Sequence, residues 1–136
     1  MPVLLQSSIN QHDISINQDT IYVYLDNEQK KGGSDYALLM RNYSNTVGLV
    51  VKEKPSNAQK SYWSDRIFIS KKEILDEGLQ KIHGHLRKGG IVVLTCDWSD
   101  DENLEKYSYK TYDYLLESIG TLRTRYSKPI DSLPQI

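Results

Sequence analysis

The sequence predicts an α/β protein with a small, mostly parallel β-sheet and helices on both of its faces, which is a three-layer sandwich. Two observations predict this class. Apolar runs of strand length alternate along the chain with segments of helical periodicity, and this alternation is typical of parallel sheets with crossover helices. Two of the main runs are almost continuously apolar, as expected for strands that helices cover on both faces.

Three runs are predicted to form the centre of the sheet. They occupy residues 21–25, 46–51 and 91–95, and they are rich in β-branched and aromatic residues. Two shorter apolar runs, at 14–16 and 67–69, are expected to add edge strands. A parallel arrangement brings the carboxyl ends of these strands to one edge of the sheet.

Helical segments lie between and after these strands. Ser34 is expected to cap a short helix that ends near Met40. Ser70 and Glu73 have the spacing of a capping box at the start of a longer helix, and a Gly-Gly pair predicts the end of that helix. Apolar residues at helical spacing over 112–122 predict the last helix.

Length and composition limit the class of protein. The 136 residues are expected to form one α/β domain over 1–125 and a C-terminal tail over 126–136. The 17 basic and 18 acidic residues nearly balance, which argues against direct binding of nucleic acid or of an anionic membrane. No apolar run approaches the about 20 residues of a membrane-spanning helix, and the first residues do not resemble a signal peptide. We therefore expect a soluble cytoplasmic protein. Its single cysteine excludes an internal disulfide, and we expect no cofactor.

A ligand site is expected beyond the carboxyl ends of the strands, where ligands of parallel sheets bind. The loops there cover residues 26–33, 52–65 and 96–103, and they are rich in polar residues. No Ser-His-Asp order, phosphate-binding P-loop or zinc spacing is present, so the sequence does not require an enzyme.

The first of these loops combines a polar strand end with a glycine turn. Asp26, with Asn27 beside it, could accept a hydrogen bond from an adenine amine or a sugar hydroxyl. Gly32 and Gly33 would let backbone N–H groups approach an anion at the start of the next helix. The alternative is an ordinary surface turn with solvated lysines.

The second loop begins with a basic group and contains two adjacent aromatic residues. Lys52 could neutralise a phosphate, while Tyr62 and Trp63 could stack on a base. Alternatively, the two rings close the edge of the core beneath a long loop. The sequence favours neither interpretation.

The third loop is acidic and leads into a segment rich in tyrosine. Its carboxylates could hold a hard cation, but acidic residues are also expected at the start of a helix, and we favour this second interpretation over a metal site. The tyrosines between 107 and 114 cannot all face inward, so some should be available to a protein partner. The possible interface comprises Trp98, Asp100, Asp101, Glu102, Tyr107 and Tyr109.

Several short motifs follow one another in a recognisable order over residues 20–120. They are the strand that ends in Asp26-Asn27, the turn Lys31-Gly32-Gly33, the segment Asn45-Thr46-Val47-Gly48, Lys52 with Pro55-Ser56, the segment Tyr62-Trp63-Ser64-Asp65, and the strand that ends at Asp97. In this order they resemble a family of short bacteriophage-type proteins, and that family is similar to macro domains, which bind ADP-ribose and related nucleotides. The resemblance implies a macro-like sandwich.

The resemblance also implies roles for particular residues. Asp26 would contact adenine, Gly32 and Gly33 would hold phosphates, and Asn45 would lie near the distal ribose. The chain departs from the family after Asp97, because Trp98 and acidic residues replace a second glycine-rich loop. Acidic side chains repel a diphosphate, so this departure favours binding without hydrolysis. The predicted ligand-binding residues are Asp26, Asn27, Gly32, Gly33, Asn45, Lys52 and Asp97.

Two functions follow as expectations. The first is a non-catalytic, phage-type, macro-like protein that binds a nucleotide-derived ligand or a nucleotide-bearing protein. It would act in host takeover or counter-defence, in the cytoplasm of the host. The alternative is a small acidic inhibitor that binds a host enzyme through a surface and has no ligand pocket.

Overall fold

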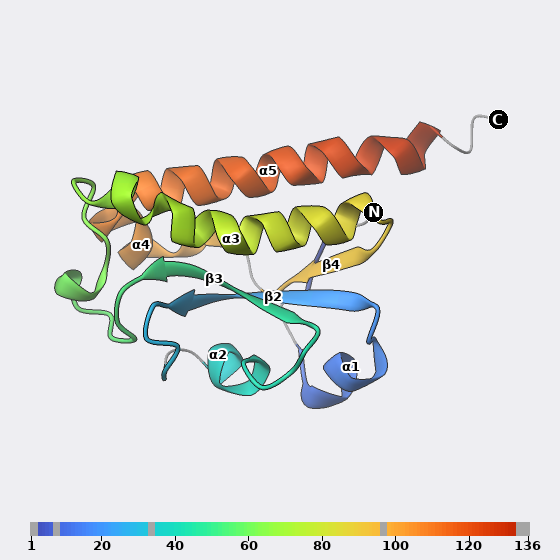
Figure 1. Ribbon diagram of the computed structural model, residues 1–136, viewed down its shortest axis with the longest axis horizontal. Helices are drawn as coiled ribbons and strands as arrows, with labels where there is room; N and C mark the ends of the chain where they lie inside the picture. Colours follow the sequence, from blue (N-terminus) through green and yellow to red (C-terminus); the bar gives the residue numbers. More distant parts are fainter. Residues whose placement is uncertain (1–2, 7–8, 33–34, 96–97, 133–136) are drawn as a thin grey trace.

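The computed structural model of the protein describes residues 3–6, 9–32, 35–95 and 98–132. A parallel β-sheet forms the middle layer, with the helices α1 (Gln11–Ile16) and α2 (Asp35–Met40) on one face. The long helices α3 (Phe68–Arg87) and α5 (Tyr109–Ser132) cover the other face (Figure 1). The predicted α/β class, with a parallel sheet between flanking helices, is confirmed.

The sheet has four parallel strands among the described residues. They are β1 (Val3–Leu5), β2 (Thr20–Asn27), β3 (Thr46–Lys52) and β4 (Ile91–Leu94), and their spatial order is β1-β4-β2-β3. The three main predicted strands are confirmed as β2, β3 and β4. Strand β1 was not predicted, because a run of three residues near the start of the chain carries too little periodicity to be recognised.

Both predicted edge strands are wrong, because these segments are helical. Residues 14–16 belong to α1, where the Asn10 side chain accepts a hydrogen bond from the backbone N–H of Asp13 at 3.0 Å. The Asp13 carboxylate accepts one from the backbone N–H of Asn10 at 3.2 Å, which completes a capping box. Residues 67–69 lie at the start of α3. Capping chemistry decides the first case, and an apolar run of three residues fits either periodicity.

Helix α3 begins two residues before the predicted capping box. Ser70 therefore lies inside the helix, and its hydroxyl donates to the backbone oxygen of Ile67 at 2.8 Å instead of capping a free N–H group. The predicted end of the helix is confirmed. Gly89 has a φ of 88° and donates its N–H to the carbonyl of Leu86 at 2.9 Å, the left-handed termination that glycine favours.

The remaining helices agree in part with the prediction. Helix α2 confirms the short helix that ends at Met40, whereas its expected cap, Ser34, lies outside the described residues. The short helix α4 (Glu102–Tyr107) was not predicted. Helix α5 contains the predicted segment 112–122 but continues to Ser132, through much of the expected tail. None of the described helices combines the length and the apolar character that crossing a membrane requires.

The hydrophobic core is divided by the sheet into two clusters. The larger cluster lies under α3 and α5 and contains Trp63, Leu75 and Leu115, which are fully buried. The smaller cluster lies under α1 and α2 and includes Tyr24. Gly48 on β3 is required there, since a Cβ at that position would approach the Tyr24 ring to 2.9 Å.

Candidate functional site

The carboxyl ends of β2 and β3 bring the first two predicted loops together. Asn27 pairs with Lys52 in the sheet register, and the backbone N–H of Glu28 donates to the Lys52 carbonyl at 2.9 Å. Helix α2 then returns Arg41 to this edge. We call the residues gathered here the strand-end cluster, and they are Asp26, Asn27, Gly32, Arg41 and Lys52.

Asp26 is buried and is already bonded to the protein. Its Oδ1 lies 2.6 Å from Arg41 Nη2 and accepts the backbone N–H of Asn27 at 2.8 Å. Its Oδ2 accepts from Arg41 Nε at 3.3 Å and from the Tyr24 hydroxyl at 3.5 Å. Because both oxygens already have partners within the protein, Asp26 orders the site and leaves no free oxygen for adenine.

The charge of Asp26 changes the titration of its neighbours. The hydrogen bond to Asp26 is the main cause that raises the pKa of Arg41 above its ordinary value. Burial, followed by the charge of Asp26, raises the pKa of Tyr24 to about 12. At neutral pH the ion pair of Asp26 and Arg41 therefore has a neutral phenol beside it.

Asn27 holds the one buried acceptor of this cluster that receives no hydrogen bond from a described residue. The side chain is 1% exposed, and its Nδ2 donates to the carbonyl of Lys31 at 2.9 Å. Its Oδ1 is buried without a described donor. The following turn reaches positive φ at Lys30 (54°) and Gly32 (51°), and Arg41 Nη2 donates to the Gly32 carbonyl at 3.0 Å. Gly33 lies outside the described residues.

Lys52 is a half-buried cation that no described carboxylate pairs with. Its Nζ donates to the Ser56 carbonyl at 3.2 Å and lies 4.7 Å from the centroid of the Tyr62 ring. Burial lowers the pKa of Lys52, and the charge of Asp101 opposes that shift. Lys52 therefore holds the second loop in place beside the end of β2.

The two aromatic residues of the second loop belong to the core. Tyr62 is 8% exposed and Trp63 is fully buried, so neither ring is available to stack on a base. The Trp63 Nε1 donates to Glu28 Oε2 at 2.8 Å, and Glu28 Oε1 lies 3.0 Å from Lys71 Nζ. These contacts join the residue after β2 to the second loop and to α3. The alternative in which the rings close the edge of the core is therefore correct.

The third loop only partly matches its predicted roles. Asp97 and the side chain of Asp100 lie outside the description. Trp98 is 5% exposed, so it belongs to the core and not to an open interface. Asp101 caps α4 by accepting the backbone N–H of Leu104 at 3.0 Å. The described residues contain no group of His, Cys, Asp or Glu that could hold a metal ion.

The possible interface residues after Trp98 differ in exposure. Glu102 is exposed in the first turn of α4, where the helix dipole favours an acid. Tyr107 is partly buried against Tyr62, with ring centroids 5.7 Å apart. Tyr109 is 52% exposed at the start of α5. Of the two tyrosines, Tyr109 is the exposed one.

Asn45 lies at the opposite edge of the sheet from Asp26, Asn27 and Lys52, which were also predicted to bind the ligand. It precedes β3, at the amino edge of the sheet, and its Nδ2 donates to the carbonyls of Ile14 at 3.0 Å, Asn17 at 3.2 Å and Thr20 at 3.3 Å. It is 6% exposed, and its Oδ1 is also buried without a described donor. Asn45 joins α1 to the sheet, and the structure does not bring it together with Asp26.

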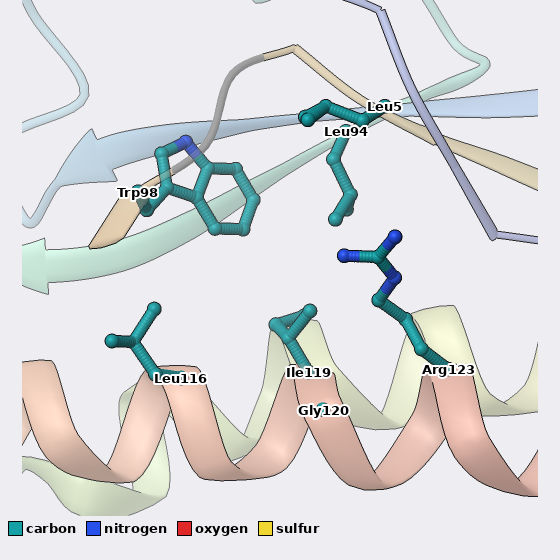
Figure 2. A pocket seen from close by; sticks show the side chains of 7 residues that line it. All are labelled: Leu5, Leu94, Trp98, Leu116, Ile119, Gly120 and Arg123. Atoms are coloured by element: carbon teal, nitrogen blue, oxygen red, sulfur yellow. The ribbon is translucent and has the colours of Figure 1, made fainter. Parts of the chain in front are cut away.

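A small apolar pocket lies at the other half of the carboxyl edge, beneath β1 and β4. Its sheet side is formed by Leu5, Leu94 and Trp98 (Figure 2). Helix α5 closes it with Leu116, Ile119, Gly120 and Arg123. The volume is about 120 Å³.

Sequence reasoning did not assign Arg41 or the apolar pocket. Arg41 follows Asp26 by fifteen residues, and only the return of α2 brings them together. A signal was present, because an acidic residue at the end of a buried strand needs a cationic partner. The pocket had no comparable signal, since it depends on β1 and on the position of α5.

Comparison with known proteins places the chain in a family. Among curated proteins and among solved structures, none matches it. A family of unknown function, DUF7831, matches residues 4–117, which include all four strands except the first residue of β1. The chain therefore belongs to the DUF7831 family of unknown function.

Proposed function

We propose that this protein binds a nucleotide-derived ligand, such as ADP-ribose, or a protein that bears one, and that it does so without catalysing a reaction. The observation that carries the proposal is the buried Oδ1 of Asn27, which lacks a described donor at the carboxyl edge of a parallel sheet. A buried acceptor left without a partner is unfavourable, and a ligand amine or hydroxyl would satisfy it.

Each residue of the strand-end cluster has a role in this proposal. Asn27 accepts a hydrogen bond from the ligand, whereas Asp26 and Arg41 hold the turn at Gly32 in position. Lys52 attracts the anionic part of the ligand, because no described carboxylate neutralises it. The proposal thus keeps the site that the resemblance to macro domains implies but moves ligand contact from Asp26 to Asn27.

Binding without catalysis is supported by the chemistry of the cluster. Its carboxylate is held by Arg41, and its remaining described groups are an amide, a glycine and a lysine whose Nζ is bonded to a loop carbonyl. None of these is placed as a general base. Trp98 follows β4 where the resemblance expects glycine, so this position lacks the conformational freedom with which glycine brings its backbone close to a diphosphate.

The biological setting is part of the proposal. The resemblance to bacteriophage-type proteins supports a role in host takeover or counter-defence, in the host cytoplasm. A protein that binds such a nucleotide without consuming it would act by sequestering a signal or by recognising a modified host protein.

A thermal-shift titration tests the proposal. ADP-ribose, NAD, cyclic ADP-ribose, ATP and cyclic dinucleotides are added at millimolar concentration, and a ligand at 100 times its Kd should stabilise the fold by about 2.7 kcal/mol. The shift should disappear in Asn27→Ala and persist in Asn45→Ala. These two variants are matched, because both residues are buried asparagines with an unpaired Oδ1, at opposite edges of the sheet. No shift with any nucleotide would refute the proposal.

Inhibition of a host enzyme through a surface is the second candidate. One observation favours it, namely the exposure of apolar side chains where α3 and α5 begin, since Ile69 is 78% and Tyr109 52% exposed. Reversing the charges of Asp100, Asp101 and Glu102 should abolish capture of the host enzyme if the acidic loop takes part. Unchanged capture would contradict a role of the acidic loop in binding the host enzyme.

A further inference from the structure

The apolar pocket has a chemistry unlike that of the strand-end cluster. Leu5 and Leu94 are the last residues of the adjacent strands β1 and β4. The buried side chains of Trp98 and Ile119 line the space next to them (Figure 2). A pocket of about 120 Å³ is slightly smaller than the engineered apolar cavities of about 150 Å³ that bind benzene. One six-membered ring, or a branched chain of similar size, fits such a space.

Arg123 supplies the only charge among the described residues that line the pocket. Its side chain rises from α5 toward Leu5 and Leu94, so that the guanidinium lies over the apolar walls (Figure 2). No described carboxylate forms an ion pair with it. A guanidinium offers a planar pair of donors that matches a carboxylate in two hydrogen bonds.

Gly120 lines the pocket on the helix side. Glycine is a poor residue for the interior of a helix, and here close packing does not require it, because an added Cβ would meet nothing within 4 Å. A longer side chain at this position would extend into the space beside Arg123.

From these features we infer that the pocket is a binding site for a small monocarboxylate with a compact apolar body, such as an aromatic acid of one ring. The apolar body fills the space between Trp98 and Ile119, and the carboxylate pairs with Arg123 at the mouth. The site is independent of the strand-end cluster, since it uses β1, β4 and α5 and none of the residues proposed to bind a nucleotide.

Benzoate is the probe, and the two indole N–H resonances of the protein report its position. In ¹H–¹⁵N spectra, benzoate at up to about 20 mM, which exceeds the Kd expected of so small a ligand, should move the Trp98 resonance and leave that of Trp63 unchanged. Benzamide has the same shape without the charge, and it should bind at least about tenfold more weakly. A Trp98 resonance that benzoate does not move would overturn the inference.

Three variants separate the roles of charge and space. Arg123→Gln should weaken benzoate at least about tenfold and remove its advantage over benzamide. Gly120→Leu should block both probes, whereas Gly120→Ala, the matched control, should bind benzoate as the wild type does. Equal binding of benzoate by Arg123→Gln and the wild type would contradict the carboxylate assignment, and binding by Gly120→Leu would contradict the pocket.

Discussion

The two halves of the sheet's carboxyl edge differ in how the protein uses its own groups. At the ends of β2 and β3 the side chains are polar, and nearly every described hydrogen-bonding atom has a partner within the protein. At the ends of β1 and β4 the side chains are apolar, and a cavity of about 120 Å³ remains. The first half is therefore ordered but leaves the Asn27 Oδ1 without a described donor. The second half leaves a cavity beside Arg123, which forms no ion pair with a described carboxylate.

This difference shows why a polar strand end is not by itself a free ligand site. Asp26 is the strongest acceptor at the edge, but burial obliges the protein to pair it with Arg41. What remains for a ligand is the weaker amide oxygen of Asn27. The pocket of about 120 Å³ lies in the other half, where the sequence carries no signal for it because its walls come from segments far apart in the chain.

Breaking the Asp26–Arg41 pair should have the largest effect on stability. Arg41→Met leaves a buried carboxylate without its cation and should lower the free energy of unfolding by about 3 kcal/mol in urea denaturation. The double variant Asp26→Asn/Arg41→Met removes both charges and should recover part of this loss. If Arg41→Met unfolds at the wild-type urea concentration, the polar half is not held together by this pair.

Asn45→Ala tests whether the amino edge is purely structural. The substitution leaves the carbonyls of Ile14, Asn17 and Thr20 without their shared donor, so unfolding should become easier by about 2 kcal/mol. Ligand binding at the strand-end cluster should not change. A loss of nucleotide binding with normal stability would assign Asn45 to the ligand site after all.

Alkaline pH should weaken the polar half through Tyr24. The unfolded phenol has an ordinary pKa of 10.0, whereas the folded value is raised to about 12. The unfolded chain therefore loses this proton first, so the stabilisation is complete below pH 10 and is lost as the pH rises to about 12. We expect a loss of about 2 kcal/mol from this group, and Tyr24→Phe should lose correspondingly less over the same range. If the free energy of unfolding of Tyr24→Phe falls between pH 10 and pH 12 as steeply as that of the wild type, the raised pKa of Tyr24 is contradicted.

Gly120→Ala should have the smallest effect, and it should be favourable. The new methyl group meets nothing within 4 Å, and alanine is the better residue in a helix, so α5 should gain about 0.5–1 kcal/mol. Chemical denaturation measures the gain. A destabilised variant would mean that the space beside Gly120 is smaller than the pocket implies.

The elements with strong local signals were predictable from the sequence, and those that depend on distant contacts were not. Strands β2, β3 and β4 follow from β-branched and aromatic runs, and Gly89 marks the end of α3. The residues 14–16 were misassigned because the Asn10 cap outweighs an alternating pattern of three residues. Asp26, Asn27 and Lys52 were correctly expected at one edge, but the pairing of Asp26 with Arg41 depends on the path of α2. The burial of Trp98 depends in the same way on α5.

Titration of the ¹⁵N-labelled protein with ADP-ribose tests the central claim most directly. The side-chain amide of Asn27 and the indole of Trp98 report on the two halves of the same edge. Binding at the strand-end cluster predicts that the Asn27 resonances shift to saturation while the Trp98 indole stays in place. Resonances of Asn27 that do not change at millimolar ADP-ribose, or a shift confined to Trp98, would contradict it.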